Sequence, residues 1–384
     1  MQMKLIFISN TFGHYQIPLC QRWNELCDFH FITTKPMSEA TKKLGFTDWA
    51  EIYPYVINAW ENDAARQRAI TLCTEADIVV AGACDESYLE PRLKENKLTF
   101  RFTERIFKKG KKSLLKPKNF SAIYRQHIAN RKKNYYILCT GADAASDFRF
   151  IGMPKEKLLR WGYFPEVPEL DIAQVLKQRG DSVIQIVWVG RLVELKHPDR
   201  ALSAAKYLKD NGVRFEMKLI GMGPLEEKLR TQIKAEHLED CVTLTGSMPA
   251  EQVREMMRAS HIFLLNSDKR EGWGAVVSEA MGCGCAAVIS DEAGAARVLI
   301  RNGENGVYYP CNDEKALNEA LYRVATDKNL RERLSCGAYA LMREVWNGTT
   351  AAERLCRFSE KLLVGEQPVQ PTNGPLSPAC EEQR

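Results

Sequence analysis

Short apolar runs alternate along the chain with longer segments in which apolar residues recur at helical spacing. In the first half this pattern predicts one early helix, Pro18–Leu26, and five strands: Lys4–Ser9, Phe29–Thr33, Asp77–Ala81, Leu98–Phe102 and Tyr136–Cys139. Continuous apolar strands joined by helices are typical of parallel sheets that are covered on both faces. The first half therefore predicts a parallel α/β domain.

The same alternation restarts near residue 182. The predicted strands are Val183–Val189, Glu216–Ile220, Val242–Leu244, Ile262–Leu265, Ala286–Ser290 and Val307–Tyr309. The predicted helices between them are Asp199–Asp210, Leu225–Glu236, Ala250–Ala259 and Ala275–Met281. We therefore expect two doubly wound, Rossmann-like α/β domains that face a cleft, with ligands bound beyond the carboxyl ends of the strands.

Changes in composition predict the boundaries. The stretch that carries several Pro and Glu residues is interpreted as a linker, residues 166–181, between a first domain, 1–165, and a second, 182–345. Two further helices, Asn329–Val345 and Thr350–Leu363, are separated at Asn347-Gly348. The tail, 366–384, is rich in Pro, Gln and Glu and is predicted to be disordered.

Charge is distributed unevenly. The 384 residues include 54 Lys and Arg and 49 Asp and Glu, a net charge of +5. The segment Arg101–Lys133, called the basic segment below, has twelve basic residues and one acid, Glu104, and so carries +11. It is either a solvated face or a surface for anionic lipid headgroups or a phosphate-bearing acceptor. Its interleaved apolar residues favour a membrane surface over nucleic acid, which we do not expect as a partner.

No apolar run approaches the 18 residues of a transmembrane helix, and Leu5–Ile8 is too short for the core of a signal peptide. We therefore expect a cytoplasmic protein that associates peripherally with the inner face of the membrane. The twelve cysteines are scattered from Cys20 to Cys380 without a C-x-x-C pair, so we expect buried, reduced thiols. No metal and no cofactor are expected.

Two glycine-containing loops follow predicted strands in the second half. The first is Gly190-Arg191, with Lys196 five residues beyond Arg191, and two cations at a strand end could clamp a diphosphate. Ordinary surface charge would explain them equally well. The second loop is Gly221-Met222-Gly223, whose glycines permit either the close approach of a ligand or a simple turn.

The third loop, Asn266–Gly274, is more specific. It follows a predicted strand, and Gly272 and Gly274 open an apolar helix whose first N–H groups would favour an anion. Glu271 lies at the mouth of this helix and Glu279 lies one to two turns inside it. An acid on an apolar helix face needs a hydrogen-bond donor, which a sugar hydroxyl would supply. The alternative is that Glu279 is a helix-surface acid.

These three loops, in this order and spacing, resemble the donor domain of GT-B glycosyltransferases, specifically of glycosyltransferase family 4. That family has a Gly-Arg and Lys element and an E-x7-E motif, which Glu271 and Glu279 satisfy in full. The resemblance is clear over residues 183–310 and has fewer markers over 1–165. Trp273 stands where Phe is commoner in the family.

The resemblance implies roles for the matching residues. Arg191 and Lys196 would bind the diphosphate of a nucleotide-sugar and neutralise the leaving group. Glu271 would hold the donor sugar hydroxyls, and Glu279 would bond the ribose. Other residues would contribute backbone groups or border the nucleobase: Gly190, Gly221, Met222, Ser247, Met248, Gly272, Trp273 and Gly274. The resemblance also implies retention of the anomeric configuration, a terminal helix over residues 349–365 that packs on the first domain, and no metal, which fits the absence of a D-x-D motif.

The first domain would then bind the acceptor. Gly13 would let the backbone approach the donor phosphate, and His14 would orient an acceptor hydroxyl, unless His14 is an ordinary surface residue. Many family members place a His after a later strand, where this chain has Thr103-Glu104-Arg105. Glu104 is therefore the candidate acceptor-side base and Arg105 a possible phosphate contact. A local ion pair would explain both residues equally well.

The sequence thus predicts a retaining hexosyltransferase-type enzyme, class EC 2.4, that moves a sugar from a nucleotide diphosphate donor to a glycan or lipid-linked acceptor. The donor is expected to be a UDP-sugar, and the setting surface polysaccharide or lipopolysaccharide assembly. Two alternatives stay open: an epimerase or hydrolase of the same architecture acting on a nucleotide-sugar, and a non-catalytic nucleotide-sugar-binding partner of another transferase.

Overall fold

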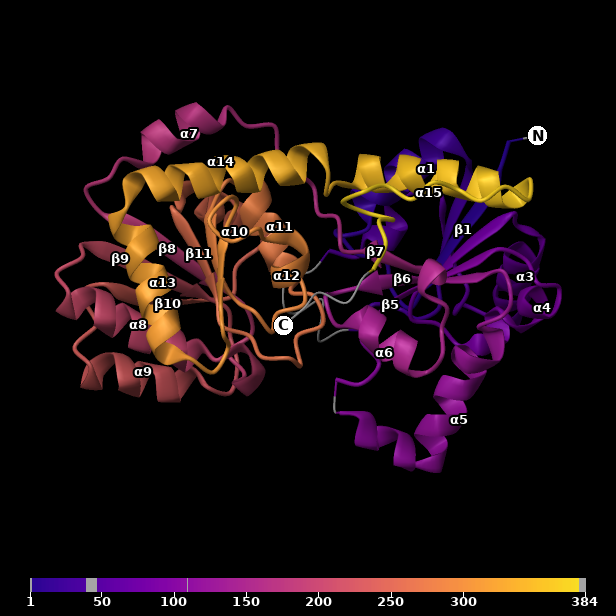
Figure 1. The fold of residues 1–384 in the computed structure, drawn as a ribbon, viewed down its shortest axis with the longest axis horizontal. Coiled ribbons are helices and arrows are strands. Elements are labelled where there is room, and N and C mark those ends of the chain that lie inside the picture. The colour runs from indigo at the N-terminus through magenta and orange to yellow at the C-terminus, as the bar shows by residue number, and fades with distance from the viewer. Residues whose placement is uncertain (1, 39–46, 109, 380–384) are drawn as a thin grey trace. The chain divides into compact units, whose positions relative to one another are not determined.

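The computed structural model describes residues 2–38, 47–108 and 110–379 of the chain (Figure 1). The chain divides into two compact units, the first made of Met1–Glu166 with Val345–Arg384 and the second of Val167–Glu344. Each unit has its own sheet and its own buried core. The expected pair of doubly wound α/β domains is therefore confirmed.

The first unit contains a seven-stranded sheet in which every neighbouring pair of strands is parallel. In spatial order its strands are β3 (Val56–Asn58), β2 (Asp28–Thr33), β1 (Lys4–Ser9), β4 (Ile78–Ala81), β5 (Thr99–Glu104), β6 (Tyr135–Thr140) and β7 (Leu158–Trp161). Every residue of β4 and of β6 is buried, as expected for central strands covered on both faces. The short edge strands β3 and β7 were not predicted.

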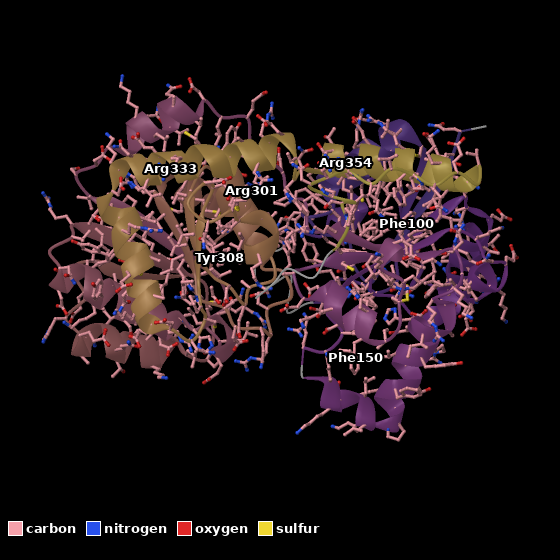
Figure 2. The ribbon with its side chains drawn as sticks, in the orientation of Figure 1. Phe100, Phe150, Arg301, Tyr308, Arg333 and Arg354 are labelled. Carbon is pink, nitrogen blue, oxygen red and sulfur yellow. The ribbon has the colours of Figure 1, made fainter. Side chains whose placement is uncertain are left out.

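Six α-helices of the first unit are described: α1 (Ile17–Leu26), α3 (Asp63–Glu75), α4 (Glu90–Lys94), α5 (Pro117–Gln126), α6 (Ala144–Phe150) and α15 (Gly348–Leu363). The helices α1 and α15 lie side by side (Figure 1), and the Trp23 indole N–H donates to the carbonyl oxygen of Ala352 at 3.3 Å. Phe100 of β5 packs against Phe358 of α15 with ring centroids 6.3 Å apart (Figure 2). The C-terminal helix therefore returns to the first unit, as expected.

The second unit contains a six-stranded parallel sheet. In spatial order its strands are β10 (Val242–Gly246), β9 (Phe215–Ile220), β8 (Ile184–Val189), β11 (Ile262–Leu265), β12 (Ala286–Ser290) and β13 (Val307–Tyr309). Its helices are α7 (Ile172–Arg179), α8 (Pro198–Asp210), α9 (Glu226–Ala235), α10 (Ala250–Ala259), α11 (Ala275–Gly282), α12 (Ala296–Leu299), α13 (Glu314–Thr326) and α14 (Lys328–Glu344). All strands of this sheet were predicted to within two residues at each end.

The segment 166–181 differs from the plain linker that we expected. It contains α7, whose N-terminus is capped by the Asp171 side chain, which accepts a hydrogen bond from Gln174 N at 3.1 Å. At the other end, the Arg179 guanidinium donates to three backbone carbonyl oxygens, those of Arg258, Cys283 and Gly284. The segment therefore packs as part of the second unit through backbone carbonyls, which a hydropathy pattern does not register.

The tail was predicted to be disordered, and this is wrong for residues 366–379. The Leu376 side chain is fully buried, and hydrogen bonds of 2.8 Å join Leu376 N to Arg160 O and Arg160 N to Ser377 O, beside β7. Arg354 of α15 donates to the carbonyl oxygen of Pro375 at 3.0 Å (Figure 2). Backbone hydrogen bonds hold this segment despite its polar composition. Residues 380–384 lie outside the described residues.

The basic segment is not one continuous charged surface. Arg101 is buried, and Arg101, Arg105 and Lys108 each contact carboxylates of the first unit. Lys109 lies outside the described residues. The cations that are exposed lie on the turn Lys111–Leu115, on α5 and just after it: Lys111, Lys112, Lys116, Lys118, Arg125 and Lys132. The exposed charge of the basic segment is therefore smaller than the +11 counted from the sequence, because carboxylates, most of them from other elements, neutralise part of it.

The cysteines agree in part with expectation. The eleven that are described are free thiols and most are buried, although Cys336 is exposed; Cys380 is not among the described residues. Over the described parts of the chain, no helix combines the length and the apolarity needed to cross a bilayer.

Candidate substrate-binding sites

Each sheet has one point at which the strand order reverses direction. In the second unit the chain runs outward from β8 through β9 to β10, and then restarts from β11 on the other side of β8. In the first unit the reversal lies between β1 and β4. Open parallel sheets bind ligands beyond the carboxyl ends of the strands at such a point. The predicted donor residues follow β8, β9, β10 and β11, at this edge of the second sheet.

Glycines let three of these loops pack directly on one another. At Gly221, φ is +141°, and a Cβ would lie 1.9 Å from the carbonyl oxygen of Gly190. The Gly221 N–H donates to Gly246 O at 2.8 Å, and the Gly190 N–H donates to Ile220 O at 3.0 Å. The segments Gly221-Met222 and Ser247-Met248 thus lie on adjacent loops, with the Met222 side chain 44% exposed. The glycines of the Gly221-Met222-Gly223 loop therefore serve both as a turn and as part of the surface that faces a ligand.

Lys196 and Glu271 form an ion pair, although 75 residues separate them in the sequence. Their side chains are only 12% and 17% exposed. The Ser267 hydroxyl donates to the same carboxylate oxygen of Glu271 at 3.2 Å. The stem of Lys196 passes over Gly190, where an added Cβ would lie 3.4 Å from the Lys196 Cδ. The structure thus brings together three of the predicted donor residues, Gly190, Lys196 and Glu271.

The start of α11 is fixed by its own sequence. Gly274 precedes the helix with φ +83°, and the Trp273 indole N–H donates to the Ser278 hydroxyl at 3.2 Å. Gly272, Trp273 and Gly274 are buried, so they contribute backbone rather than side chains to the surface. Glu279 is 8% exposed within the helix, which contradicts the alternative of a helix-surface acid.

Arg191, unlike Lys196, has no ion-pair partner among the described residues. Its side chain is exposed and makes no hydrogen bond or ion pair with any other described residue. Arg191 lies two residues beyond the end of β8, at the carboxyl edge of the sheet, so its exposed cation is available to an anionic ligand.

Two residues at this edge were missed by the sequence reasoning. His197 Nε2 and an Asp268 carboxylate oxygen lie 3.2 Å apart, and the Asp268 N–H donates to Leu195 O at 2.9 Å. These bonds join the loop after β8 to the loop after β11. The sequence indicated these two residues only by their position beside the predicted donor motifs. Their contact could not be predicted, because 71 residues separate them.

The first unit has a cavity of about 580 Å³ at its own switch point, beyond the carboxyl ends of β1, β4 and β5. A Cβ at Gly82, which follows β4, would lie 2.8 Å from the Ser9 hydroxyl, so glycine permits this close approach of two strand ends. Gly13, Glu104 and Arg105 line the cavity, and their roles toward a ligand stay predictions. His14 is not among the lining residues, and its ring packs on Tyr15 with centroids 3.8 Å apart.

Glu104 and Arg105 each form an ion pair, which was the alternative to their roles as acceptor-side base and phosphate contact. Glu104 pairs with Lys108, and its other carboxylate oxygen lies 3.4 Å from the Tyr163 hydroxyl. Arg105 contacts Asp143 and Asp147 of the α6 region at 3.4 Å. Glu104 still faces the cavity, so the ion pair does not remove it as a contact for a ligand hydroxyl.

Two residues that line this cavity, Arg101 and His127, belong to a buried polar network. Arg101 contacts both carboxylate oxygens of Glu86 at 2.8 Å, and its Nε donates to the Tyr135 hydroxyl at 3.2 Å. His127 Nδ1 lies 3.2 Å from the same hydroxyl. Burial raises the pKa of Glu86 despite the opposing effect of Arg101. Burial, assisted by Arg101, lowers the pKa of His127 to about 3. His127 is therefore neutral near pH 7.

No group of three or more His, Cys, Asp or Glu residues within residues 2–38, 47–108 and 110–379 is arranged to hold a metal ion.

Comparison with known proteins finds relatives of the second unit. Residues 173–340 match the family model described as glycosyl transferases group 1. The chain is 32% identical over 219 residues to the amylovoran biosynthesis glycosyltransferase AmsK of Erwinia amylovora, which covers 55% of this chain and 53% of that protein. It is 34% identical over 143 residues to WcaL of Escherichia coli K12, a protein named for colanic acid biosynthesis, with 36% of this chain and 35% of that protein covered. The chain thus spans about half or less of these relatives.

Solved structures match nearly the whole chain. The Anabaena protein HepE in complex with UDP and glucose gives a TM-score of 0.66 at 16% identity, covering 94% of this chain and 99% of that one. The pneumococcal O-GlcNAc transferase GtfA in complex with UDP and GlcNAc gives 0.67 at 12% identity, with the same coverage. These matches confirm the expected GT-B fold. Membership of family 4 and retention of configuration stay predictions.

Proposed function

We propose that this chain is a retaining family 4 glycosyltransferase that moves a sugar from a UDP-sugar to a glycan or lipid-linked acceptor, without a metal. The observation that carries the proposal is the Lys196–Glu271 ion pair at the switch point of the second sheet, beside the start of α11. The relatives named for amylovoran and colanic acid biosynthesis, and the fold neighbours bound to UDP, support a nucleotide-sugar donor and polysaccharide assembly.

The ion pair suits a site that receives an anion and a polyol together. A donor diphosphate would take Lys196 from Glu271, and the released carboxylate would accept hydrogen bonds from the sugar hydroxyls. As the bond from the sugar C1 to the diphosphate oxygen breaks, negative charge develops on the diphosphate. Lys196, Arg191 and the first N–H groups of α11 would stabilise that charge. The acceptor oxygen would attack C1 on the face that the diphosphate leaves, which retains the configuration and needs no enzyme nucleophile.

The acceptor would bind in the cavity of the first unit. Glu104 lines this cavity and is the candidate acceptor-side base. His14 lies next to the lining residues Gly13 and Tyr15, and its role toward the acceptor hydroxyl stays a prediction.

Calorimetric titration of UDP, GDP and ADP tests the donor site. We expect UDP to bind selectively, and Glu279→Gln to weaken it by about ten-fold or more, because a charged hydrogen bond to the ribose is lost. The matched control is Glu319→Gln on the exposed face of α13, which should leave the affinity unchanged. Selectivity for GDP would redirect the donor to guanosine sugars, and no binding of any nucleotide would overturn the donor site.

Turnover of UDP-sugars separates the enzyme from its alternatives. Transfer to an acceptor, with the product anomer assigned by NMR, distinguishes a retaining transferase from an epimerase or a hydrolase. Nucleotide binding without turnover on any acceptor would instead indicate a non-catalytic nucleotide-sugar-binding protein.

The exposed part of the basic segment supports peripheral membrane association. Leu115, Phe120 and Tyr124 are 82%, 49% and 51% exposed, and they lie among the exposed cations of α5 and the turn before it. Figure 1 shows α5 at the edge of the first unit, away from its sheet. Apolar side chains surrounded by cations are typical of interfacial helices on anionic membranes.

Vesicle sedimentation tests this association. We expect binding to phosphatidylglycerol vesicles that is lost on phosphatidylcholine vesicles and reduced in the double variant Leu115→Ser, Phe120→Ser. Val369→Ser, at a residue that is 95% exposed in the C-terminal segment, is the matched control. Equal sedimentation of the double variant and wild type would exclude α5 as the membrane contact.

A further inference from the structure

The cavity of the first unit contains no cation that is available to a phosphate among its described lining residues. Arg101 is held by both carboxylate oxygens of Glu86, and Lys108 pairs with Glu104. Arg105, the third lining cation, lies between two aspartates, Asp143 and Asp147. Four carboxylates therefore surround three cations. An anionic ligand would have to break an ion pair here without the help of an unpaired cation such as Arg191 at the edge of the second sheet, whereas an uncharged ligand would break none.

One side of the cavity is aromatic. The Tyr163 ring lies 5.4 Å from the ring of Phe102 and 5.9 Å from that of Tyr15, and all three residues line the cavity. A pyranose ring presents C–H groups on its faces and hydroxyls around its rim. Aromatic faces therefore suit the sugar faces, and carboxylates and other polar groups suit the rim.

His127 supplies a hydrogen-bond acceptor to the same space. The Tyr135 hydroxyl donates its only proton to Gln126 O at 3.0 Å, so it must accept from His127 at Nδ1. Nδ1 therefore carries the imidazole proton and Nε2 has the lone pair. His127 lines the cavity, and Nε2 makes no hydrogen bond with the other described residues. A ligand hydroxyl can donate to it.

We propose that this cavity binds an uncharged sugar residue of the acceptor, with one face of the pyranose on Tyr163, a hydroxyl donating to His127 Nε2 and another donating to Glu104. This inference rests on the proposed function, since it names the chemical class of the acceptor at the acceptor site. Any phosphate or diphosphate of a lipid-linked acceptor then lies outside the cavity. The low pKa of His127 is consistent with the assignment, because the ring stays an acceptor over the physiological range.

Binding of small sugars to the full chain tests the proposal. The probes are methyl α-D-glucopyranoside, methyl α-D-galactopyranoside and methyl α-D-mannopyranoside, each compared with glucose 1-phosphate or galactose 1-phosphate, by saturation-transfer NMR. We expect at least one neutral glycoside to bind at a site that Tyr163→Ala weakens, and the sugar phosphates to bind that same site more weakly. Sugar phosphates that bind more tightly than the glycosides and are weakened by Tyr163→Ala overturn the proposal, as does the failure of every neutral probe at up to about 100 mM.

Three variants of lining residues locate the bound sugar. Tyr163→Ala should weaken the glycoside by about ten-fold, whereas Tyr163→Phe keeps the aromatic face and should have little effect. His127→Asn keeps a donor near Nδ1 for Tyr135 but removes the Nε2 acceptor, and should weaken the glycoside by about five-fold. Tyr124→Ala on the exposed face of α5 is the control. Unchanged affinity in both Tyr163→Ala and His127→Asn would overturn the site.

Measuring nucleotide binding in parallel distinguishes a failure of this inference from a failure of the proposed function. The variants of the first unit should leave UDP affinity unchanged, because the donor residues lie in the second unit. If UDP binds and is used for transfer but no neutral sugar binds, only the present inference fails. If a neutral sugar binds and no nucleotide does, the proposed function fails and the sugar site stands.

Discussion

At the scale of single residues, Gly221 shows how closely the donor loops are packed. Its backbone has φ +141°, and a Cβ would meet the Gly190 carbonyl oxygen at 1.9 Å. We expect Gly221→Ala to lower the free energy of unfolding of the second unit by about 3 kcal/mol or more, because backbone strain and a clash with a carbonyl combine. Urea denaturation measures this loss.

Gly212→Ala is the matched control for this prediction. Gly212 also has positive φ, at +72°, but an added Cβ would have nothing within 4 Å. Only the backbone strain is then introduced, and we expect a loss of about 1 kcal/mol. Equal losses in the two variants would show that the contact between the loops is not tight.

His127 gives the first unit a specific dependence on pH. Its pKa is lowered to about 3 in the folded protein, mainly by burial, against about 6.5 in the unfolded chain. Below pH 6.5 the unfolded state therefore binds a proton that the folded state does not, and stability falls as the pH decreases toward 3. We expect the unfolding free energy of wild type to fall more steeply than that of His127→Asn between pH 6 and 4, by up to about 1.4 kcal/mol per pH unit.

Chemical denaturation of both proteins across this pH range measures the difference. Glu86 and Arg101 are present in wild type and variant alike, so the comparison isolates the imidazole. Parallel pH profiles would mean that the folded state does not lower the pKa of His127, and Nε2 would then stop being an acceptor below about pH 6.5.

At the scale of elements, the C-terminal segment acts as an addition to the edge of the first sheet. Leu376 is fully buried, and its N–H donates to the carbonyl oxygen of Arg160 in β7. We expect Leu376→Ala to destabilise the first unit by about 2–5 kcal/mol, the usual range for removing a buried leucine side chain. Thermal unfolding measures the effect.

Val369 lies in the same segment but is 95% exposed, and Val369→Ala should therefore leave the transition within about 0.5 kcal/mol of wild type. If Leu376→Ala were as stable as Val369→Ala, the C-terminal segment would not be docked on β7 in solution.

At the scale of the whole molecule, two separate cores predict two responses to a ligand. The core of the first unit is built by β1, β4, β6 and their helices, and that of the second by β8, β9, β11, β12 and theirs. UDP at 100 times its dissociation constant would stabilise the unit that binds it by about 2.7 kcal/mol. We expect UDP to raise the melting temperature of one calorimetric transition, while Leu376→Ala lowers the other.

The opposite pattern would contradict this division. A single transition that UDP and Leu376→Ala both displace would mean that the units unfold as one cooperative body. A UDP effect on the transition that Leu376→Ala lowers would place the nucleotide in the first unit.

The extent of sequence-based prediction differs among these scales. The apolar runs that became β11, β12 and β13 were predicted with their observed bounds, because a buried parallel strand is a continuous local pattern. The predicted ends of β8 and β11 also placed Gly190, Lys196 and Glu271 at one edge of a sheet. By contrast, the tail that contains Leu376 was predicted to be disordered, since its contacts are hydrogen bonds to β7 rather than a hydrophobic pattern.

The sequence by itself determined the two parallel-sheet units and the edge of the second sheet at which a donor would bind, because strand periodicity and helix-opening glycines are properties of neighbouring residues. Only the tertiary structure decided which charges are available there. Arg101 was counted as part of a basic surface, and it is buried on Glu86, 15 residues away. Whether a cation faces solvent, a ligand or a carboxylate depends on distant elements that packing brings together, and no local pattern records that choice.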